Sequence, residues 1–128
     1  MSSGPIITAE MLVFLSEYHL ASLTTLRSDG SPHVVPVGFS YDPELHIVRV
    51  ITFPSSVKYK NAVRGGRAVV SQVDGGRWLS LEGTVTGTSD PTRVAAAVAG
   101  YTARYRQPKE REDRVAIEIA VDRVLGRA

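Results

Sequence analysis

The feature that most constrains the fold is a series of six short segments rich in β-branched and apolar residues, separated by turn residues. Such segments are typical of strands with one face toward a core. They cover residues 20–27, 32–40, 45–53, 67–74, 77–88 and 114–124. The first three follow one another with short loops, which predicts an antiparallel meander. Gly83 and Gly87 in the fifth segment predict bulges or bends.

Capping residues and glycine or proline punctuation predict three short helices, over residues 9–17, 57–64 and 91–106. In the first, Met11, Leu12 and Leu15 share one face and are expected to pack on the core. A chain of 128 residues forms one domain, residues 1–128. Six strands with only short helices predict a mainly β (α+β) fold, a small six-stranded antiparallel barrel, because closure removes exposed sheet edges.

The composition excludes several kinds of chemistry. The chain has no cysteine, so thiol nucleophiles, thiolate metal sites and disulfides are excluded. Its three histidines form no HxH or HxxxH pair, so we expect no metal site. The sequence also lacks GxGxxG, GxxxxGK[ST] and GxSxG. If the protein performs redox or group-transfer chemistry, a bound cofactor is expected to carry the reactive atoms.

The net charge of +2 gives little support for nucleic-acid binding, so no nucleic-acid partner is expected. The N-terminal residues lack a basic segment followed by an apolar run, which predicts no signal peptide. No apolar run approaches the roughly 20 residues of a membrane span. We therefore expect a cytoplasmic protein with no membrane partner.

Residues 55–61 combine features of an anion-binding loop. A serine-rich turn leads into a helix N-terminus, where backbone N–H groups and the helix dipole favour negative charge. Lys58 adds an ammonium group, and Ser56 and Asn61 add hydroxyl and amide donors. The same residues also fit an ordinary capped surface helix, which is the commoner arrangement, so both interpretations stay open.

The second apolar segment has a proline inside it. Pro36 removes a ladder donor and so predicts an edge strand or a bulge. The valines beside it, Val35 and Val37, would form a flat apolar wall for the edge of a heterocycle, although a plain edge strand is the alternative. His33 is a candidate acid or base, but a lone histidine beside a turn is more often simply exposed.

Trp78, the single tryptophan, follows a Gly-Gly turn. Its ring could lie over a ligand or a partner subunit, and ordinary packing is equally consistent. Glu82 has no evident second carboxylate for paired acid–base work of the glycosidase kind.

Taken together, residues 14–42, 48–63 and 72–85 resemble the pyridoxamine 5′-phosphate oxidase-like split-barrel superfamily. The order and spacing of the three segments carry this resemblance, which spans nearly the whole chain. The chain is most similar to actinobacterial reductases that use the deazaflavin coenzyme F420, and among them to the biliverdin reductase-like proteins. The resemblance implies the split barrel that binds flavin mononucleotide (FMN) in other members.

The resemblance also implies a homodimer with two cofactor sites between the subunits. By this resemblance, the strand residues along the tricyclic ring, with a threonine nearby, are Val35, Pro36, Val37 and Thr52. The residues that hold the phosphate would be Ser55, Ser56, Lys58 and Asn61, which favours the anion-binding interpretation above.

Three further residues enter through the resemblance alone. Arg77 and Trp78 would approach the site from the other subunit, and Arg64 would meet the acidic oligoglutamate tail of F420. Arg77 is the candidate for electrostatic support of developing negative charge, and no side chain is assigned as a catalytic acid. The proton of the reduction is expected from solvent.

We therefore expect an F420H2-dependent reductase, an oxidoreductase that transfers a hydride to a conjugated small-molecule acceptor such as biliverdin or a related tetrapyrrole. Two alternatives remain at this stage. One is an FMN-dependent oxidase or reductase on the same barrel, and the other is a non-catalytic carrier of a cofactor or tetrapyrrole.

Overall fold

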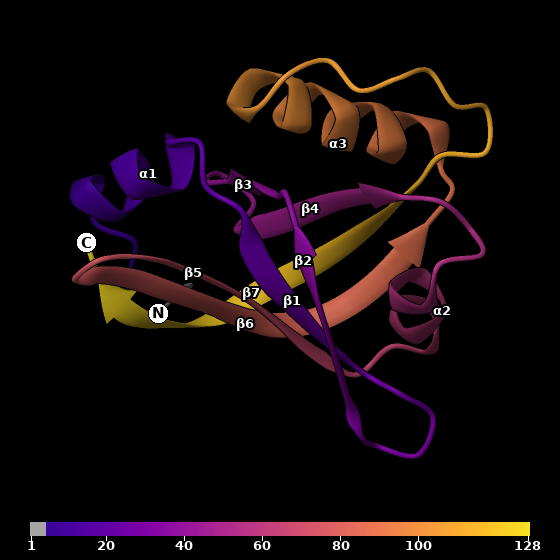
Figure 1. Cartoon of the computed structure of the whole chain (residues 1–128), viewed down its shortest axis with the longest axis horizontal. Coiled ribbons are helices and arrows are strands. Elements are labelled where there is room, and N and C mark those ends of the chain that lie inside the picture. The colour runs from indigo at the N-terminus through magenta and orange to yellow at the C-terminus, as the bar shows by residue number, and fades with distance from the viewer. Residues whose placement is uncertain (1–4) are drawn as a thin grey trace.

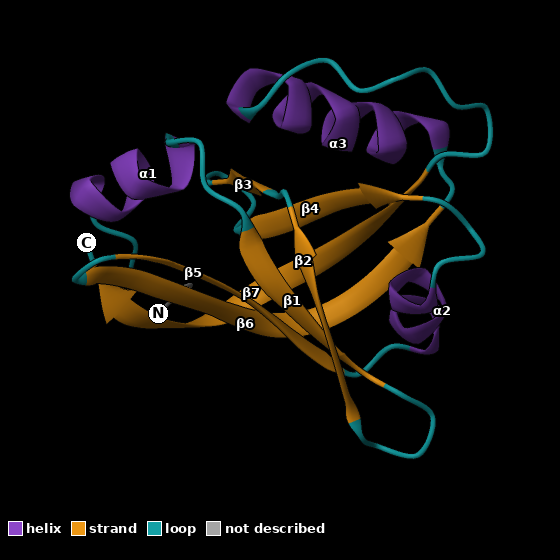
Figure 2. Cartoon of the chain, viewed as in Figure 1, coloured by secondary structure: helices purple, strands orange, loops and turns teal. Residues whose placement is uncertain are grey.

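The computed structural model describes residues 5–128 and forms one seven-stranded antiparallel sheet with three helices around it (Figures 1 and 2). The strands are β1 (Ala21–Leu26), β2 (Pro32–Val37), β3 (Ser40–Asp42), β4 (Ile47–Thr52), β5 (Arg67–Asp74), β6 (Arg77–Thr88) and β7 (Val115–Arg127). The helices are α1 (Ala9–Ser16), α2 (Val57–Arg64) and α3 (Pro91–Arg104). None of them is long and apolar enough to cross a membrane.

The sheet curls because its two edge strands are consecutive in the chain. The strand order is β2-β1-β5-β6-β7-β4-β3, so β2 and β3 lie at opposite edges. Only Gly38 and Phe39 connect them, a span of two residues. The edges must therefore approach each other, while no strand pairing joins β2 to β3 or β4 among residues 5–128. The result is a barrel split along one seam, and the expected mainly β split barrel is confirmed.

Two details of the prediction are wrong. The expected strand over 32–40 breaks at Gly38, and Ser40–Asp42 pairs with β4, so there are seven strands instead of six. The expected meander is also absent, because β4 pairs with β7 and β3 while β2 pairs with β1. The physical reason is the sharp change of direction at Gly38–Phe39, which takes the chain from one ladder to another.

Two glycines in β6 permit close packing. The register shifts between Glu82 and Gly83, which confirms the predicted bulge. A Cβ on Gly83 would lie 1.8 Å from the carbonyl oxygen of Ala120, so only glycine fits there. Gly87 causes no register shift; a Cβ there would lie 2.9 Å from side-chain atoms of Tyr59 and Val63, so it allows α2 to pack against β6.

The core fills the inside of the curled sheet. Its largest fully buried apolar side chains are Phe14, Phe39, Leu23, Leu79, Leu81, Ile117, Ile119, Val48, Val50, Val70 and Val85. Helix α1 contributes Phe14 and Leu15, whereas Leu12 is 37% exposed, so the face predicted for this helix is partly wrong. The face toward the core consists of Met11, Phe14 and Leu15, so Phe14 takes the place expected for Leu12.

The Gly38–Phe39 corner is held by the end of α3. The Tyr105 hydroxyl accepts a hydrogen bond from the Phe39 N–H (3.2 Å) and donates one to the His19 carbonyl (2.6 Å). The Arg104 guanidinium donates to the carbonyls of Phe39 and Glu17 and to the Gln72 side chain, each at 2.8 Å. These bonds satisfy backbone groups that the corner removes from the sheet ladders.

Tyr105→Phe should destabilise the protein by about 1–3 kcal/mol, because it leaves the Phe39 N–H and the His19 carbonyl without their partner. The measurement is the free energy of unfolding in urea. Tyr18→Phe is the matched control, since this side chain is exposed and its hydroxyl makes no hydrogen bond within residues 5–128. Equal stability of the two variants would contradict the role given to the corner.

Candidate functional site

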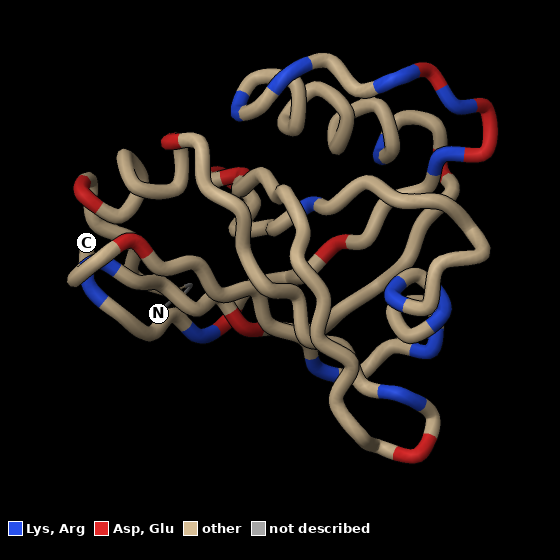
Figure 3. Tube along the Cα trace, viewed as in Figure 1, with Lys and Arg blue, Asp and Glu red and all other residues tan. Residues whose placement is uncertain are grey.

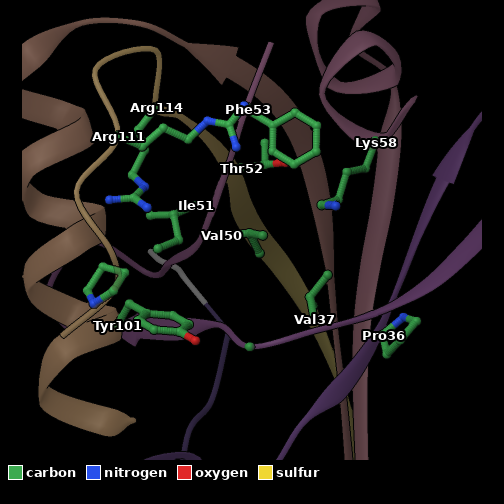
Figure 4. A pocket seen from close by; sticks show the side chains of 12 residues that line it. Pro36, Val37, Val50, Ile51, Thr52, Phe53, Lys58, Tyr101, Arg111 and Arg114 are labelled. Carbon is green, nitrogen blue, oxygen red and sulfur yellow. The ribbon is translucent and has the colours of Figure 1, made fainter. Parts of the chain in front are cut away.

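The candidate site is a cavity of about 330 Å³ at the seam of the barrel. It lies between β2, β4, the start of α2, α3 and the loop that joins α3 to β7. Lys and Arg residues are frequent on α2 and along this loop (Figure 3). In the close view, residues of α3 and the loop lie on the left, those of β2 and α2 on the right, and those of β4 between them (Figure 4).

One wall of the cavity is apolar and comes from the two strands at the seam. Strand β2 supplies Pro36, Val37 and Gly38, the last just beyond its end, and β4 supplies Val50 and Ile51. Pro36 lies in an edge strand, as predicted, where a proline is tolerated. This wall can accept one face or edge of a flat, mainly apolar ring.

Lys58 is the cation at the α2 side of the cavity. It lies in the first turn of α2, with its Nζ 6.0 Å from the centre of the Phe53 ring. Partial burial lowers the pKa of the ammonium, and no carboxylate of residues 5–128 forms an ion pair with it. A partly desolvated ammonium without a counter-ion favours an anionic ligand.

The start of α2 is built around Ser56. Its hydroxyl oxygen accepts from the Tyr59 N–H (3.2 Å) and from the Thr52 hydroxyl (2.9 Å), which ties the helix cap to the end of β4. The backbone N–H groups of Val57 and Lys58 have no acceptor within residues 5–128. A helix N-terminus with two unused donors and an ammonium group is suited to a phosphate.

The loop between α3 and β7 contributes two arginines that the sequence analysis missed. Arg111 stacks on Phe53, with Cζ 4.3 Å from the ring centre, and pairs with Asp113. This pairing holds the pKa of the Asp113 carboxyl below its usual range. Arg114 donates to the Lys109 carbonyl at 2.7 Å. The available signal was a pair of arginines around the start of the last strand; Arg114 was predicted to be the first residue of that strand, over 114–124, and no ligand role was expected for either.

The structure brings together Pro36, Val37, Thr52 and Lys58 around one cavity, but it places other expected residues beside it. Ser56 does not line the cavity but accepts a hydrogen bond from Thr52, which does. Ser55 is exposed. Val35 packs partly against the core and lines a separate hollow on the outer face of the sheet. A role for Val35, Ser55 and Ser56 at a ligand remains a prediction.

Asn61 and Arg64 lie on the side of α2 that faces β1. The Asn61 amide donates to the Thr25 hydroxyl at 3.0 Å and accepts from Arg64 at 2.5 Å. Arg64 also donates to the Leu26 carbonyl at 2.9 Å. Neither lines the cavity, and their assignment to a ligand stays a prediction.

Arg77 and Trp78 lie at the β5–β6 turn, at the other end of the sheet from α2 (Figure 1). Arg77 pairs with Glu17 and Asp74, and its guanidinium lies 4.4 Å from the Phe14 ring centre. These residues cannot reach the cavity of their own chain. Their expected role at the site of a second subunit stays a prediction.

Comparison with known proteins shows which family the chain belongs to. The family described as pyridoxamine 5′-phosphate oxidase matches residues 7–128. The chain is 56% identical over 122 residues to the F420H(2)-dependent biliverdin reductase of Mycobacterium tuberculosis (strain CDC 1551 / Oshkosh). That alignment covers 95% of this chain and 89% of the relative.

Solved structures agree with this placement. A protein described as an F420 reductase superposes with a TM-score of 0.75 at 25% identity, covering 93% of this chain and 98% of that one. A conserved hypothetical protein of Mycobacterium tuberculosis superposes with a TM-score of 0.79 at 21% identity, covering 94% and 84% of the two chains. The second likeness shows the shared fold alone.

Ser56→Ala should cost about 1–2 kcal/mol in the free energy of unfolding, because it removes the acceptor for the Tyr59 N–H and for the Thr52 hydroxyl. Urea unfolding provides the measurement. Ser55→Ala is the matched control one residue away, and as an exposed side chain without a hydrogen bond within residues 5–128 it should change stability by less than about 0.5 kcal/mol. A neutral Ser56→Ala would argue against the cap described here.

Proposed function

Because the chain belongs to the pyridoxamine 5′-phosphate oxidase family, we propose that it is an F420H2-dependent reductase acting on a conjugated acceptor such as biliverdin. The observation that carries the proposal is the cavity, which combines an apolar wall with Lys58 at a helix N-terminus, without an ion-pair partner within residues 5–128. The relative with 56% identity supports F420 over FMN. The enzyme is accordingly an oxidoreductase.

The residues present fit such a cofactor. F420 has a flat tricyclic ring and a phosphate, and the cavity offers the Pro36–Gly38 wall for the ring and the start of α2 for the phosphate. When bound, F420H2 supplies the hydride. Lys58 would hold the phosphate, and Thr52 would border the ring. The predicted role of Arg64 with the acidic tail remains a prediction.

The tasks left to the protein are orientation and exclusion of water. The seam strands would define the plane in which a ring can lie, because Val37 and Val50 are buried in the sheet. Tyr101 and the α3–β7 loop cover the opposite side of the cavity. Holding two reactants face to face removes much of the entropic part of the barrier, and no protein nucleophile is needed.

We further propose that the protein is a homodimer joined through the outer face of β1, β2 and β5. This face carries a hollow of about 430 Å³ that no charged residue of the described chain lines. Val73 in this hollow is 69% exposed. An uncharged, partly apolar surface of this kind is typical of an interface between subunits. Pro36 lines both this hollow and the cavity, so a second subunit here would border the site.

A cytoplasmic location remains a prediction.

Calorimetric titration of the purified protein with F420 and with FMN tests the proposed cofactor. We expect tight binding of F420, and oxidation of F420H2 only when biliverdin is added. Tight binding of FMN without binding of F420 would favour the flavin alternative. Binding of biliverdin without oxidation of F420H2 would favour the carrier alternative.

Lys58→Ala should weaken F420 binding roughly 10- to 100-fold in the same titration, because it removes a charge-assisted contact to phosphate. Lys60→Ala is the matched control, since Lys60 lies on the exposed side of the same helix and outside the cavity. Wild-type affinity should fall as the pH rises through the lowered pKa of Lys58, because only the protonated ammonium attracts the phosphate. Lys58→Arg should keep its affinity over that range, since guanidinium stays charged.

Val73→Glu should shift the sedimentation mass from dimer to monomer, because it places a charge on the proposed interface. Leu45→Glu is the control, as an exposed leucine in the turn between β3 and β4, away from that face. A wild type that sediments as a monomer, or a Val73→Glu variant that remains dimeric, would contradict the proposed interface.

A further inference from the structure

The three cations that line the cavity differ in how their charges are compensated. Arg111 pairs with Asp113 and stacks on Phe53. Arg114 makes no ion pair within residues 5–128, and its hydrogen bond is to the neutral carbonyl of Lys109. Lys58 is likewise without an acidic partner there. The cavity therefore has two cations without an ion-pair partner, and no carboxylate of the described residues lines it.

These two charges lie on different sides of the cavity. In Figure 4 Lys58 lies to one side of Phe53 and the loop arginines lie to the other. Arg114 immediately precedes β7, whose first residue, Val115, pairs with Thr52. Its backbone is thus fixed by the sheet, and its guanidinium is oriented by the 2.7 Å bond to Lys109. A single phosphate at the start of α2 satisfies Lys58 and leaves Arg114 available.

We propose that Arg114 binds a carboxylate of the acceptor; this rests on the proposed function. A cofactor ring held on the β2–β4 wall would leave the side toward α3 and the α3–β7 loop for the acceptor. Arg114 lines that side. Guanidinium binds carboxylate in a planar, two-bond geometry that an acceptor with acidic side chains can use. The site therefore selects conjugated acceptors that carry a carboxylate.

A second hollow shares Arg111 and Arg114 with the cavity. This space of about 330 Å³ lies between α3 and its following loop, with Val94 and Val98 on the helix side and Glu112 on the loop side. The carboxylate of Glu112 disfavours a second anion in this hollow. A carboxylate of the acceptor therefore belongs on the cavity side of Arg114, where no acidic residue among residues 5–128 lines the space.

Arg111 has a smaller part in this arrangement. Its charge is already balanced by Asp113, and its stacking on Phe53 shapes the cavity. Replacing it should therefore affect the acceptor less than replacing Arg114. A larger rise in KM on replacing Arg114 than on replacing Arg111 distinguishes a specific carboxylate contact from a general effect of positive charge on the loop.

The experiment compares wild type with Arg114→Gln using biliverdin and its dimethyl ester, which lacks both free carboxylates. For Arg114→Gln we expect KM for biliverdin to rise roughly 10- to 100-fold, with kcat and the Kd of F420 within about twofold of wild type. With the dimethyl ester the two proteins should have equal KM. The variant and the ester together form a double-mutant cycle that isolates the contact.

Arg106→Gln is the matched control, because it removes one exposed positive charge from the same loop outside the cavity. Arg111→Gln should raise KM less than Arg114→Gln. A thermal melt and the Kd of F420 establish that each variant is folded and holds its cofactor.

Three results would overturn the proposal. Unchanged KM of Arg114→Gln for biliverdin would remove Arg114 from the acceptor site and leave the proposed function intact. A weaker Kd for F420 with an unchanged KM for biliverdin would mean that the arginine binds the acidic tail of the cofactor. A wild type that binds F420H2 and reduces neither acceptor would overturn the proposed function together with this inference.

Discussion

The arrangement of the protein depends on the connection between β2 and β3. The chain crosses from one edge of the sheet to the other through Gly38 and Phe39, and so the edges are forced together. The backbone groups of Phe39 lie outside the strand ladders, and Tyr105 and Arg104 form hydrogen bonds with them. Gly38 also permits the tyrosines of α3 to approach, since a Cβ there would lie 3.0 Å from the Tyr105 ring. The same contacts therefore close the barrel, dock α3 and form one wall of the cavity.

Some of the positive charge is balanced by ion pairs, and some of it is not. Arg67 pairs with Asp122 and Glu82, Arg93 pairs with the buried Glu118, and Arg77 pairs with Glu17. These pairs join strands and helices to one another. Lys58 and Arg114 are different, because they line the cavity without acidic partners among residues 5–128. A net charge of only +2 is thus compatible with a local concentration of positive charge at the cavity.

Local patterns predicted the elements well, but the pairing of strands required information from distant residues. Helix α2 spans Val57–Arg64 as its serine cap and glycine end predicted. The break at Gly38 was missed because the apolar pattern continues through it, and the hydroxyl that stabilises the corner comes from Tyr105, 66 residues later. Lys58, which lines the cavity, was a candidate from the sequence because a helix N-terminus is a local signal. Arg114 lines it as well but was not a candidate, because its orientation depends on the loop carbonyl of Lys109.

The seam of the barrel also leaves backbone groups beside the cavity without a strand partner. Strand β2 pairs only with β1, and residues 50–52 of β4 pair only with β7 within residues 5–128. The N–H and C=O groups on the seam side of these residues are therefore outside any ladder. Since both strands line the cavity, the edge of a flat molecule there can form hydrogen bonds with backbone as well as with side chains. A barrel closed by hydrogen bonds all round would offer no such backbone groups.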